Sequence, residues 1–204
     1  DSETGTITDY DTDGGLDVVI PSEINSIKVR TIGKYAFSNN NINSVFIPQS
    51  VETINHSAFK GQNENLEEVV IENAGVEFNY SGNPGTDSHP FADNGEIKLI
   101  IGNENNSGEI IASSLFNDVD GTSLTELEIK SSVQKINLYA FRNNDITGEL
   151  IIPDSVEVLG KGAFYNNKLT EVQISDSVTE ISSFAFCNNE LTGELLIPNS
   201  VKKI

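Results

Sequence analysis

The chain has 204 residues, 31 of them acidic and 12 basic, which gives a formal net charge of -19. Such a charge repels the phosphates of nucleic acids and an anionic membrane surface, and no segment is rich in lysine and arginine. The single cysteine excludes an internal disulfide, and no apolar stretch approaches the length of a membrane-spanning helix. We therefore expect neither nucleic-acid binding nor membrane insertion, while a cationic partner, a neutral glycan or divalent ions remain open.

The N-terminal segment "DYDTDGGLD" places three aspartates at alternate positions, Asp9, Asp11 and Asp13. This spacing imitates the start of a calcium-binding loop, but the glutamate that closes such a loop is replaced by Ile20. The flanking "TIT" and "LDVVI" favour a turn between two strands. We expect residues 1–17 to form a hairpin that caps the fold, with a calcium site at the aspartates as the alternative and no other metal or cofactor.

Short apolar strands then recur along the chain. They end at Ile20, Ile47, Ile71, Ile101, Ile129, Ile152, Ile174 and Ile197. Strands that recur once per turn of a solenoid stack in parallel, each beside its equivalent in the next turn. The sequence therefore predicts one parallel sheet along the whole chain.

A phenylalanine that follows a small residue marks one point in each unit. The clear matches are Phe37, Phe59, Phe141, Phe164 and Phe186, and the weaker ones are Phe91 and Phe116. The intervals Phe37–Phe59, Phe141–Phe164 and Phe164–Phe186 are 22, 23 and 22 residues, a period within the range of leucine-rich repeats. The repeat is regular in residues 18–71 and 124–204 and irregular in residues 72–123.

Two polar columns accompany the phenylalanines. Asparagine pairs follow them at Asn143-Asn144, Asn166-Asn167 and Asn188-Asn189. We expect these amides to satisfy loop backbone groups between coils. Four residues before each phenylalanine stand Gly33, Asn55, Asn137, Gly160 and Ser182. Glycine and asparagine tolerate a positive φ, so we expect a left-handed turn residue at this column.

The segment "IPDSVEVLGKGAFYNNKLTEVQI" resembles the BspA-like leucine-rich-repeat family of bacterial and protist surface proteins. The resemblance covers residues 18–71 and 124–204, where the small-Phe pair, the Ile-Pro-x-Ser-Val phrase and the spacing recur together. It implies a secreted or surface-anchored solenoid, bacterial in origin, that binds host or matrix molecules, and it implies no catalytic residues. We expect a single α/β leucine-rich-repeat domain over residues 1–204, right-handed and β-dominated. A parallel sheet would form one face, and short turns or helical segments the other.

Three smaller features favour structural roles. The loop "GTDSHPFADNG" holds Asp87, His89 and Asp93, but one histidine with two carboxylates is a weak metal signal, so we expect a polar loop. Cys187 stands in a column that accepts lysine and arginine elsewhere, which predicts an exposed thiol. Glycosylation sequons begin at Asn55, Asn79 and Asn105 and matter only in a eukaryotic source.

The outward side chains of the strands form two columns, because alternate residues of a strand point to opposite faces. The first column reads Asp17, Ser44, Glu68, Lys98, Glu126, Glu149, Glu171 and Glu194. The second reads Val19, Phe46, Val70, Ile100, Glu128, Ile151, Gln173 and Leu196. An apolar stripe beside an acidic ladder predicts a docking surface, unless the apolar residues merely favour strand structure or residues 72–123 fold over them.

We therefore expect a monomeric, non-enzymatic adhesion module that engages a protein or glycan through this face. The candidate contact residues are Phe46, Val70, Ile100, Ile151, Leu196, Glu68, Glu126, Glu149, Glu171 and Glu194. A structural spacer that binds nothing, and self-association through the apolar stripe, are the alternatives. The chain contains no methionine and stops within the repeated phrase, so we also expect a processed or trimmed product.

Overall fold

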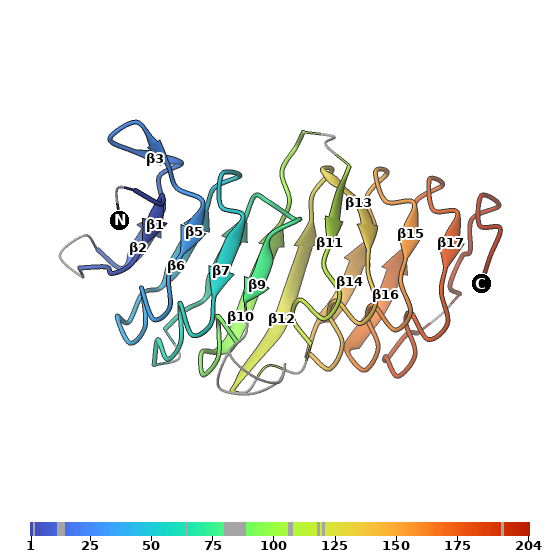
Figure 1. Cartoon of the computed structure of the whole chain (residues 1–204). Coiled ribbons are helices and arrows are strands. Elements are labelled where there is room, and N and C mark those ends of the chain that lie inside the picture. The colour runs from blue at the N-terminus through green and yellow to red at the C-terminus, as the bar shows by residue number, and fades with distance from the viewer. Residues whose placement is uncertain are drawn as a thin grey trace.

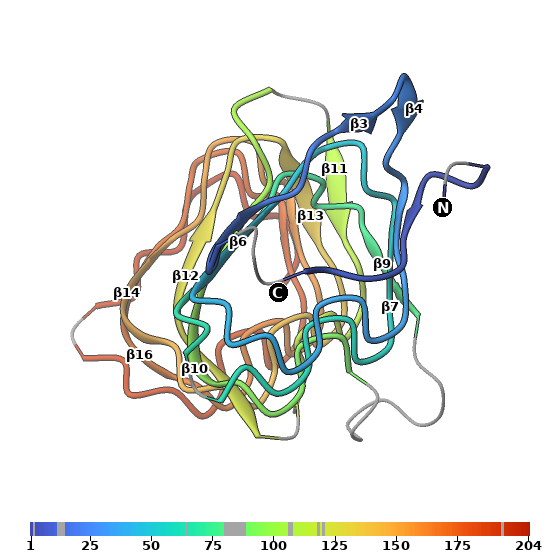
Figure 2. The same ribbon diagram turned by 90° about the vertical axis from the view of Figure 1, so that its left-hand side faces the viewer.

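The computed structural model describes residues 1, 3–11, 15–63, 65–79, 89–105, 108–117, 119, 121–192 and 194–204. These residues form an elongated stack of coils that runs from the N-terminus at one end to the C-terminus at the other (Figure 1). A view along the stack shows two rows of strands that face each other across the interior (Figure 2). The fold is a parallel β solenoid.

The first row of strands is the one expected from the sequence. It contains β2 (Asp17–Val19), β6 (Ser44–Ile47), β8 (Glu68–Ile71), β10 (Gly95–Ile101), β12 (Thr122–Ile129), β14 (Thr147–Ile151) and β16 (Lys168–Gln173). One parallel sheet contains β2, β6, β8, β10 and β12, and β14 pairs in parallel with β16 in a second sheet. Residues 194–197 were expected to form the last strand, but they do not form one. Leu195 and Ile197 are exposed there, so burial does not hold this segment in place.

The second row replaces the turns and helical segments that the sequence predicted for the opposite face. It contains β1 (Thr6–Ile7), β5 (Thr31–Ile32), β7 (Thr53–Asn55), β9 (Glu77–Asn79), β11 (Glu109–Ile111), β13 (Val133–Ile136), β15 (Val158–Leu159) and β17 (Glu180–Ile181). The described residues contain no helix, so the β-dominated solenoid is confirmed but its α/β description is not. The reason is that the return segments bond to one another across coils, as Glu157 N does to Gln134 O at 2.9 Å, and this leaves no backbone groups for helical pairing.

The structure does not pair the two N-terminal segments with each other as the expected hairpin. β1 pairs in parallel with β5, and β2 pairs in parallel with β6, so the two segments lie in opposite rows and form a first coil. Tyr10 lies between them and packs on Phe37, with 4.9 Å between ring centroids. An antiparallel hairpin does occur at this end, but it is formed by β3 (Glu23–Ile24) and β4 (Ile27–Lys28).

The repeated phenylalanines stack along the interior. Ring centroids of Phe37 and Phe59 are 4.9 Å apart, and those of Phe59 and Phe91 are also 4.9 Å apart. Phe91 in turn stacks on Phe116 at 5.6 Å, so the weak matches in residues 72–123 occupy the same position as the clear ones. The irregular middle therefore continues the core.

The asparagine prediction is confirmed. Asn167 Nδ2 donates to the carbonyl oxygens of Phe141 and Phe164 at 2.9 and 3.2 Å, and its Oδ1 accepts from Ile146 N at 3.2 Å. Asn144 and Asn189 make equivalent bonds in neighbouring coils. The second asparagine of each pair thus links successive coils through otherwise unsatisfied backbone groups.

The expected left-handed column was placed two residues too early. Positive φ angles occur immediately before the small residue of the small-Phe pair, as at Tyr139 (54°), Gly162 (58°) and Phe184 (62°). Gly160 has a different role, because a Cβ there would lie 2.5 Å from the carbonyl carbon of Asn137 on the preceding coil. The column containing Gly33 and Gly160 therefore needs close backbone approach and not a positive φ.

Candidate binding face

The outward residues of the first strand row lie in register from one coil to the next. Paired strands bring Val19 beside Phe46, Phe46 beside Val70, and Val70 beside Ile100. Glu128 follows Ile100 on the next strand and ends this run. The structure thus brings together the first four apolar residues of the predicted stripe as a continuous row, which we call the apolar row (Val19, Phe46, Val70 and Ile100).

The apolar row keeps contact with solvent. Val19 is 72% exposed, and Phe46, Val70 and Ile100 are half-buried by their neighbours on the sheet. The described residues between 72 and 123 contribute β9, β10, β11 and part of β12 to the two rows of the solenoid wall. These strands extend the sheets instead of lying over the apolar row.

The acidic column beside the apolar row is interrupted by a cation. Lys98 Nζ lies 3.0 Å from a carboxylate oxygen of Glu68 on the adjacent strand. This hydrogen bond is the largest cause that raises the pKa of Lys98, and the charges of Glu68, Glu126 and Glu128 add to it. At the start of the column Ser44 Oγ donates to Asp17 at 2.9 Å. Like charges are therefore partly compensated next to the apolar row.

The C-terminal half of the face is more acidic and less continuous. Glu149 pairs with Glu171, and Ile151 pairs with Gln173, whose amide donates to Glu149. Glu171 and Glu194 line a shallow hollow of about 210 Å³ together with two threonines. Ile151 and Leu196 are 57% and 74% exposed but are not joined into a row, because Gln173 follows Ile151 on the next strand and Leu196 lies outside the strands. The face thus has an apolar half and an acidic half.

The metal alternatives gain no support. Asp13 lies outside the described residues, so the calcium alternative stays a prediction, and Asp9 accepts a hydrogen bond from Tyr10 N at 2.9 Å. No group of three metal-ligating side chains occurs in the part of the chain that the structure describes. Asp87 also lies outside the described residues, and Asp93 pairs with Lys60 at 3.2 Å.

His89 is a structural residue. Its Nδ1 accepts from Phe91 N at 3.1 Å, and its Nε2 lies 3.0 Å from the carbonyl oxygen of Leu115. The ring is buried against Phe78 and Phe116, and this burial lowers the pKa of His89 to about 4, against a smaller opposing effect of the bond to Leu115. A neutral, buried imidazole with both nitrogens engaged holds the middle coils together.

Cys187 and the sequon at Asn55 were also singled out in the sequence. Cys187 is exposed, as its column predicted. Asn55 is partly buried, and its side-chain amide donates to Ile32 O at 2.9 Å, so this sequon is engaged in linking coils. In the described part of the chain, no helix has the length and hydrophobicity needed to span a membrane.

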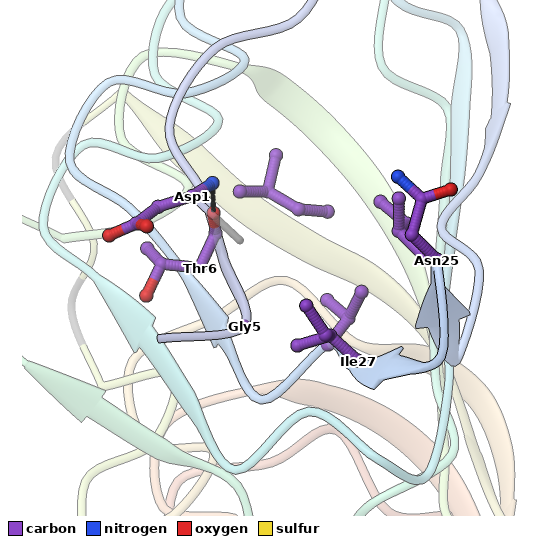
Figure 3. A pocket seen from close by; sticks show the side chains of 8 residues that line it. Asp1, Gly5, Thr6, Asn25 and Ile27 are labelled. Atoms are coloured by element: carbon purple, nitrogen blue, oxygen red, sulfur yellow. Dashed lines mark hydrogen bonds between the residues drawn. The ribbon is translucent and has the colours of Figure 1, made fainter. Parts of the chain in front are cut away.

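The hollows on the surface differ in size. One of about 90 Å³ lies at the N-terminal end between β1 and the β3–β4 hairpin, lined by Thr6, Asn25, Ile27 and mainly apolar neighbours (Figure 3). The N-terminal amine of Asp1 donates to Thr6 O at 2.6 Å beside it (Figure 3). This hollow has no pair of side chains suited to acid–base or nucleophilic chemistry.

One group of side chains, at the turns beside the phenylalanine stack, was not expected from the sequence. Arg142 lies over the rings of Tyr139 and Tyr165, which belong to different coils. The available signal was the column that holds Arg142, Tyr165 and Cys187, whose members were predicted only to face solvent. Their contact with Tyr139 depends on how the coils stack.

Parallel strands in register, a stacked aromatic core and linking asparagines define a solenoid of leucine-rich repeats, a class that presents extended surfaces to partners. The model of the BspA-type leucine-rich-repeat region matches residues 18–81 and 103–204 in 6 copies, so the chain belongs to this family. This confirms the resemblance found in the repeats.

One solved structure to which the chain is similar is a leucine-rich cell surface protein from Faecalibacterium prausnitzii A2-165. The two chains are 22% identical, with a TM-score of 0.47, over 97% of this chain and 45% of the other. The present chain therefore spans less than half the length of that protein. No curated protein matches the chain.

Proposed function

We propose that the chain is a secreted or cell-surface binding module that holds a protein partner through the first strand row, in the service of adhesion. The observation that carries this proposal is the apolar row, in which four side chains lie in register on adjacent strands with contact to solvent. Isolated exposed apolar residues are common, but a continuous row is typical of interaction surfaces. The resemblance to surface proteins supports the extracellular location.

Charge defines the kind of partner. The acidic column runs beside the apolar row, and the net charge of -19 surrounds it with a negative field. A partner surface with apolar side chains flanked by lysine and arginine complements both features. The proposed contacts are Phe46, Val70, Ile100 and Glu68 in the apolar half, with Glu126, Glu149, Ile151, Glu171, Glu194 and Leu196 extending the acidic half.

The test is binding to an array of immobilised matrix proteins and glycans. Phe46→Asp with Ile100→Asp should abolish capture of any protein that the unmodified chain binds, because two charges would enter the apolar row. Val19→Asp gives a second test at a position exposed enough to leave the fold unaffected. The matched control is Thr53→Asp with Gln134→Asp on β7 and β13 of the second row, which should bind normally.

Unchanged binding by a folded Phe46→Asp/Ile100→Asp variant would exclude this face. Absence of any binding by the unmodified chain would favour a structural spacer. A dimer that Val19→Asp dissolves would favour self-association through the apolar row.

A further inference from the structure

A second surface, at the turns beside the phenylalanine stack, has the features of a ligand site. Tyr139, Gly162 and Phe184 occupy the equivalent position in three successive coils. Backbone bonds hold these coils in register: Tyr139 N donates to Lys161 O, and Gly162 N donates to Ser183 O, both at 3.0 Å. The three residues therefore lie in a line along the edge of the solenoid.

The aromatic residues in this line are held in an unfavourable backbone conformation. Tyr139 and Phe184 have φ angles of 54° and 62°, which bulky side chains rarely adopt. Ser57 and Ser114 stand at the same position in other coils, so the turn does not require an aromatic ring. Strained backbone conformations of this kind cluster at functional sites.

Gly162 makes room for one of these rings. A Cβ at Gly162 would lie 2.5 Å from Cε1 of Tyr139, so the tyrosine ring occupies the space above the glycine. Phe184 stands on the far side and is 58% exposed. A depression lined by both aromatic residues lies beside the ring of Tyr139.

The depression contains cations without carboxylate partners. The guanidinium of Arg142 lies 5.0 Å from the ring centroid of Tyr139 and 5.6 Å from that of Tyr165. Its Nε is buried without a hydrogen-bond partner, and the ion pairs of the described residues include neither Arg142 nor Lys161. Asn188 fixes the Tyr165 hydroxyl by a hydrogen bond of 2.9 Å. The chain has 31 acidic residues, so two cations without ion-pair partners at one hollow create a local positive potential that attracts anions.

The size of the hollow limits the ligand. It measures about 290 Å³ and is lined by Tyr139, Arg142, Lys161, Tyr165 and Phe184. This is the low end of the range for small-molecule sites, enough for one or two ring-sized groups. A polyanion such as nucleic acid is disfavoured by the charge of the rest of the chain, so the ligand should present one carboxylate at this point.

We propose that this hollow binds a glycan through a carboxylate-bearing sugar residue. Arg142 and Lys161 receive the carboxylate, since a guanidinium suits the planar, two-oxygen group. The C–H face of the sugar ring packs on the exposed ring of Phe184, whose π face carries partial negative charge. The aromatic walls favour a rigid ring over an acidic peptide side chain, which has no face to place against them.

The experiment measures binding of defined sugars to the purified chain by calorimetry or NMR titration. The acidic probes are sialyllactose and digalacturonic acid, and the neutral probes are lactose and the methyl ester of digalacturonic acid. The peptide acetyl-Gly-Glu-Gly-amide supplies a carboxylate without a sugar ring. We expect saturable binding of at least one acidic sugar and at least ~10-fold weaker binding of its neutral counterpart and of the peptide, the loss expected for a charge-assisted bond.

Variants assign the binding to this hollow. Arg142→Gln should weaken binding of the acidic sugar by ~10-fold or more, and Phe184→Ser, which places the residue found at Ser57, should also weaken it. The matched control is Lys34→Gln, because Lys34 follows Gly33 as Lys161 follows Gly160 but lies in a coil with Ser38 in place of Arg142 or Tyr165. This control should bind as the unmodified chain does.

Several results would overturn the proposal: no saturable binding of either acidic sugar, equal binding of the neutral sugars or of the peptide, or unchanged binding by folded Arg142→Gln and Phe184→Ser variants. The Phe46→Asp/Ile100→Asp variant should keep its sugar binding, so failure of this site and failure of the binding face are distinguishable.

Discussion

The ring of Phe164 lies parallel to the ring of Phe186 on the next coil, with 5.5 Å between centroids and 2° between planes. Phe141 continues the stack on the other side of Phe164 at 5.6 Å. Phe164 is thus packed between rings of the two adjacent coils, at the centre of a stack of three. Removing a central ring should weaken both contacts.

Phe164→Ala is therefore expected to lower the free energy of unfolding by about 3–5 kcal/mol, through lost burial and the cavity left behind. Urea unfolding followed by circular dichroism measures this loss. Phe184→Ala is the control, because Phe184 is exposed and its strained backbone is retained by alanine. Equal destabilisation by the two substitutions would contradict a core role for the stack.

The first strand row could be predicted from the sequence because its residues alternate between buried and exposed, as in β6, where Val45 and Ile47 point inward. The second row could not. Strands such as β15 (Val158–Leu159) have two residues, too few to show a period, and they are strands only because an equivalent segment lies on each side.

Of the two candidate sites, the binding face could be predicted from the sequence and the hollow beside Arg142 could not. The register of Phe46 and Val70 follows from their equivalent positions in the strand motifs of two successive coils, and the pairing confirms it. The contact of Arg142 with Tyr139 and Tyr165 needs knowledge of how turns from adjacent coils overlap, which no local pattern carries. The left-handed position was misplaced because a glycine can indicate either a positive φ or a close approach of two backbones. At Gly160 the reason is the close approach to the preceding coil.

The two members of an asparagine pair should respond differently to substitution. Asn167→Ala should cost about 2–4 kcal/mol, because it leaves a buried N–H and two carbonyl groups without partners. Asn166→Gly should change stability by less than about 0.5 kcal/mol, since Asn166 is exposed and glycine tolerates its φ of 57°. Chemical unfolding of both variants tests this, and a larger loss at Asn166 would refute the assignment.

Stability should depend on the protonation of His89. Its pKa is lowered from 6.5 to about 4, so the unfolded chain binds more protons than the folded chain between these two values. The unfolding free energy contributed by the neutral ring should therefore fall as pH drops through this window, by about 2 kcal/mol between pH 7 and pH 5.

His89→Gln retains a donor and an acceptor but does not titrate in this range. The measurement is the difference in unfolding free energy between this variant and the unmodified chain, taken at several pH values. The unmodified chain should lose stability more steeply on acidification. Parallel curves would show that His89 is not held neutral by its surroundings.

The Lys98–Glu68 pair should contribute a small, salt-dependent stabilisation. Both side chains are more than a third exposed, so Lys98→Gln should cost no more than about 0.5 kcal/mol at low ionic strength. The loss should shrink in about 0.5 M salt, which screens exposed charges. Lys161→Gln, which breaks no ion pair, is the control, and a salt-independent loss at Lys98 would point to packing instead of charge.

The alignment of equivalent residues on successive parallel strands is tested most directly by a distance between spin labels at Val19→Cys and Glu128→Cys, with Cys187→Ser to remove the native thiol. Four strand spacings separate these outward positions along β2, β6, β8, β10 and β12, or about 19 Å between Cα atoms. A single narrow distribution centred near this value is the predicted result. A broad distribution, or a mean beyond about 30 Å, would contradict the stacked coils, since it exceeds six strand spacings.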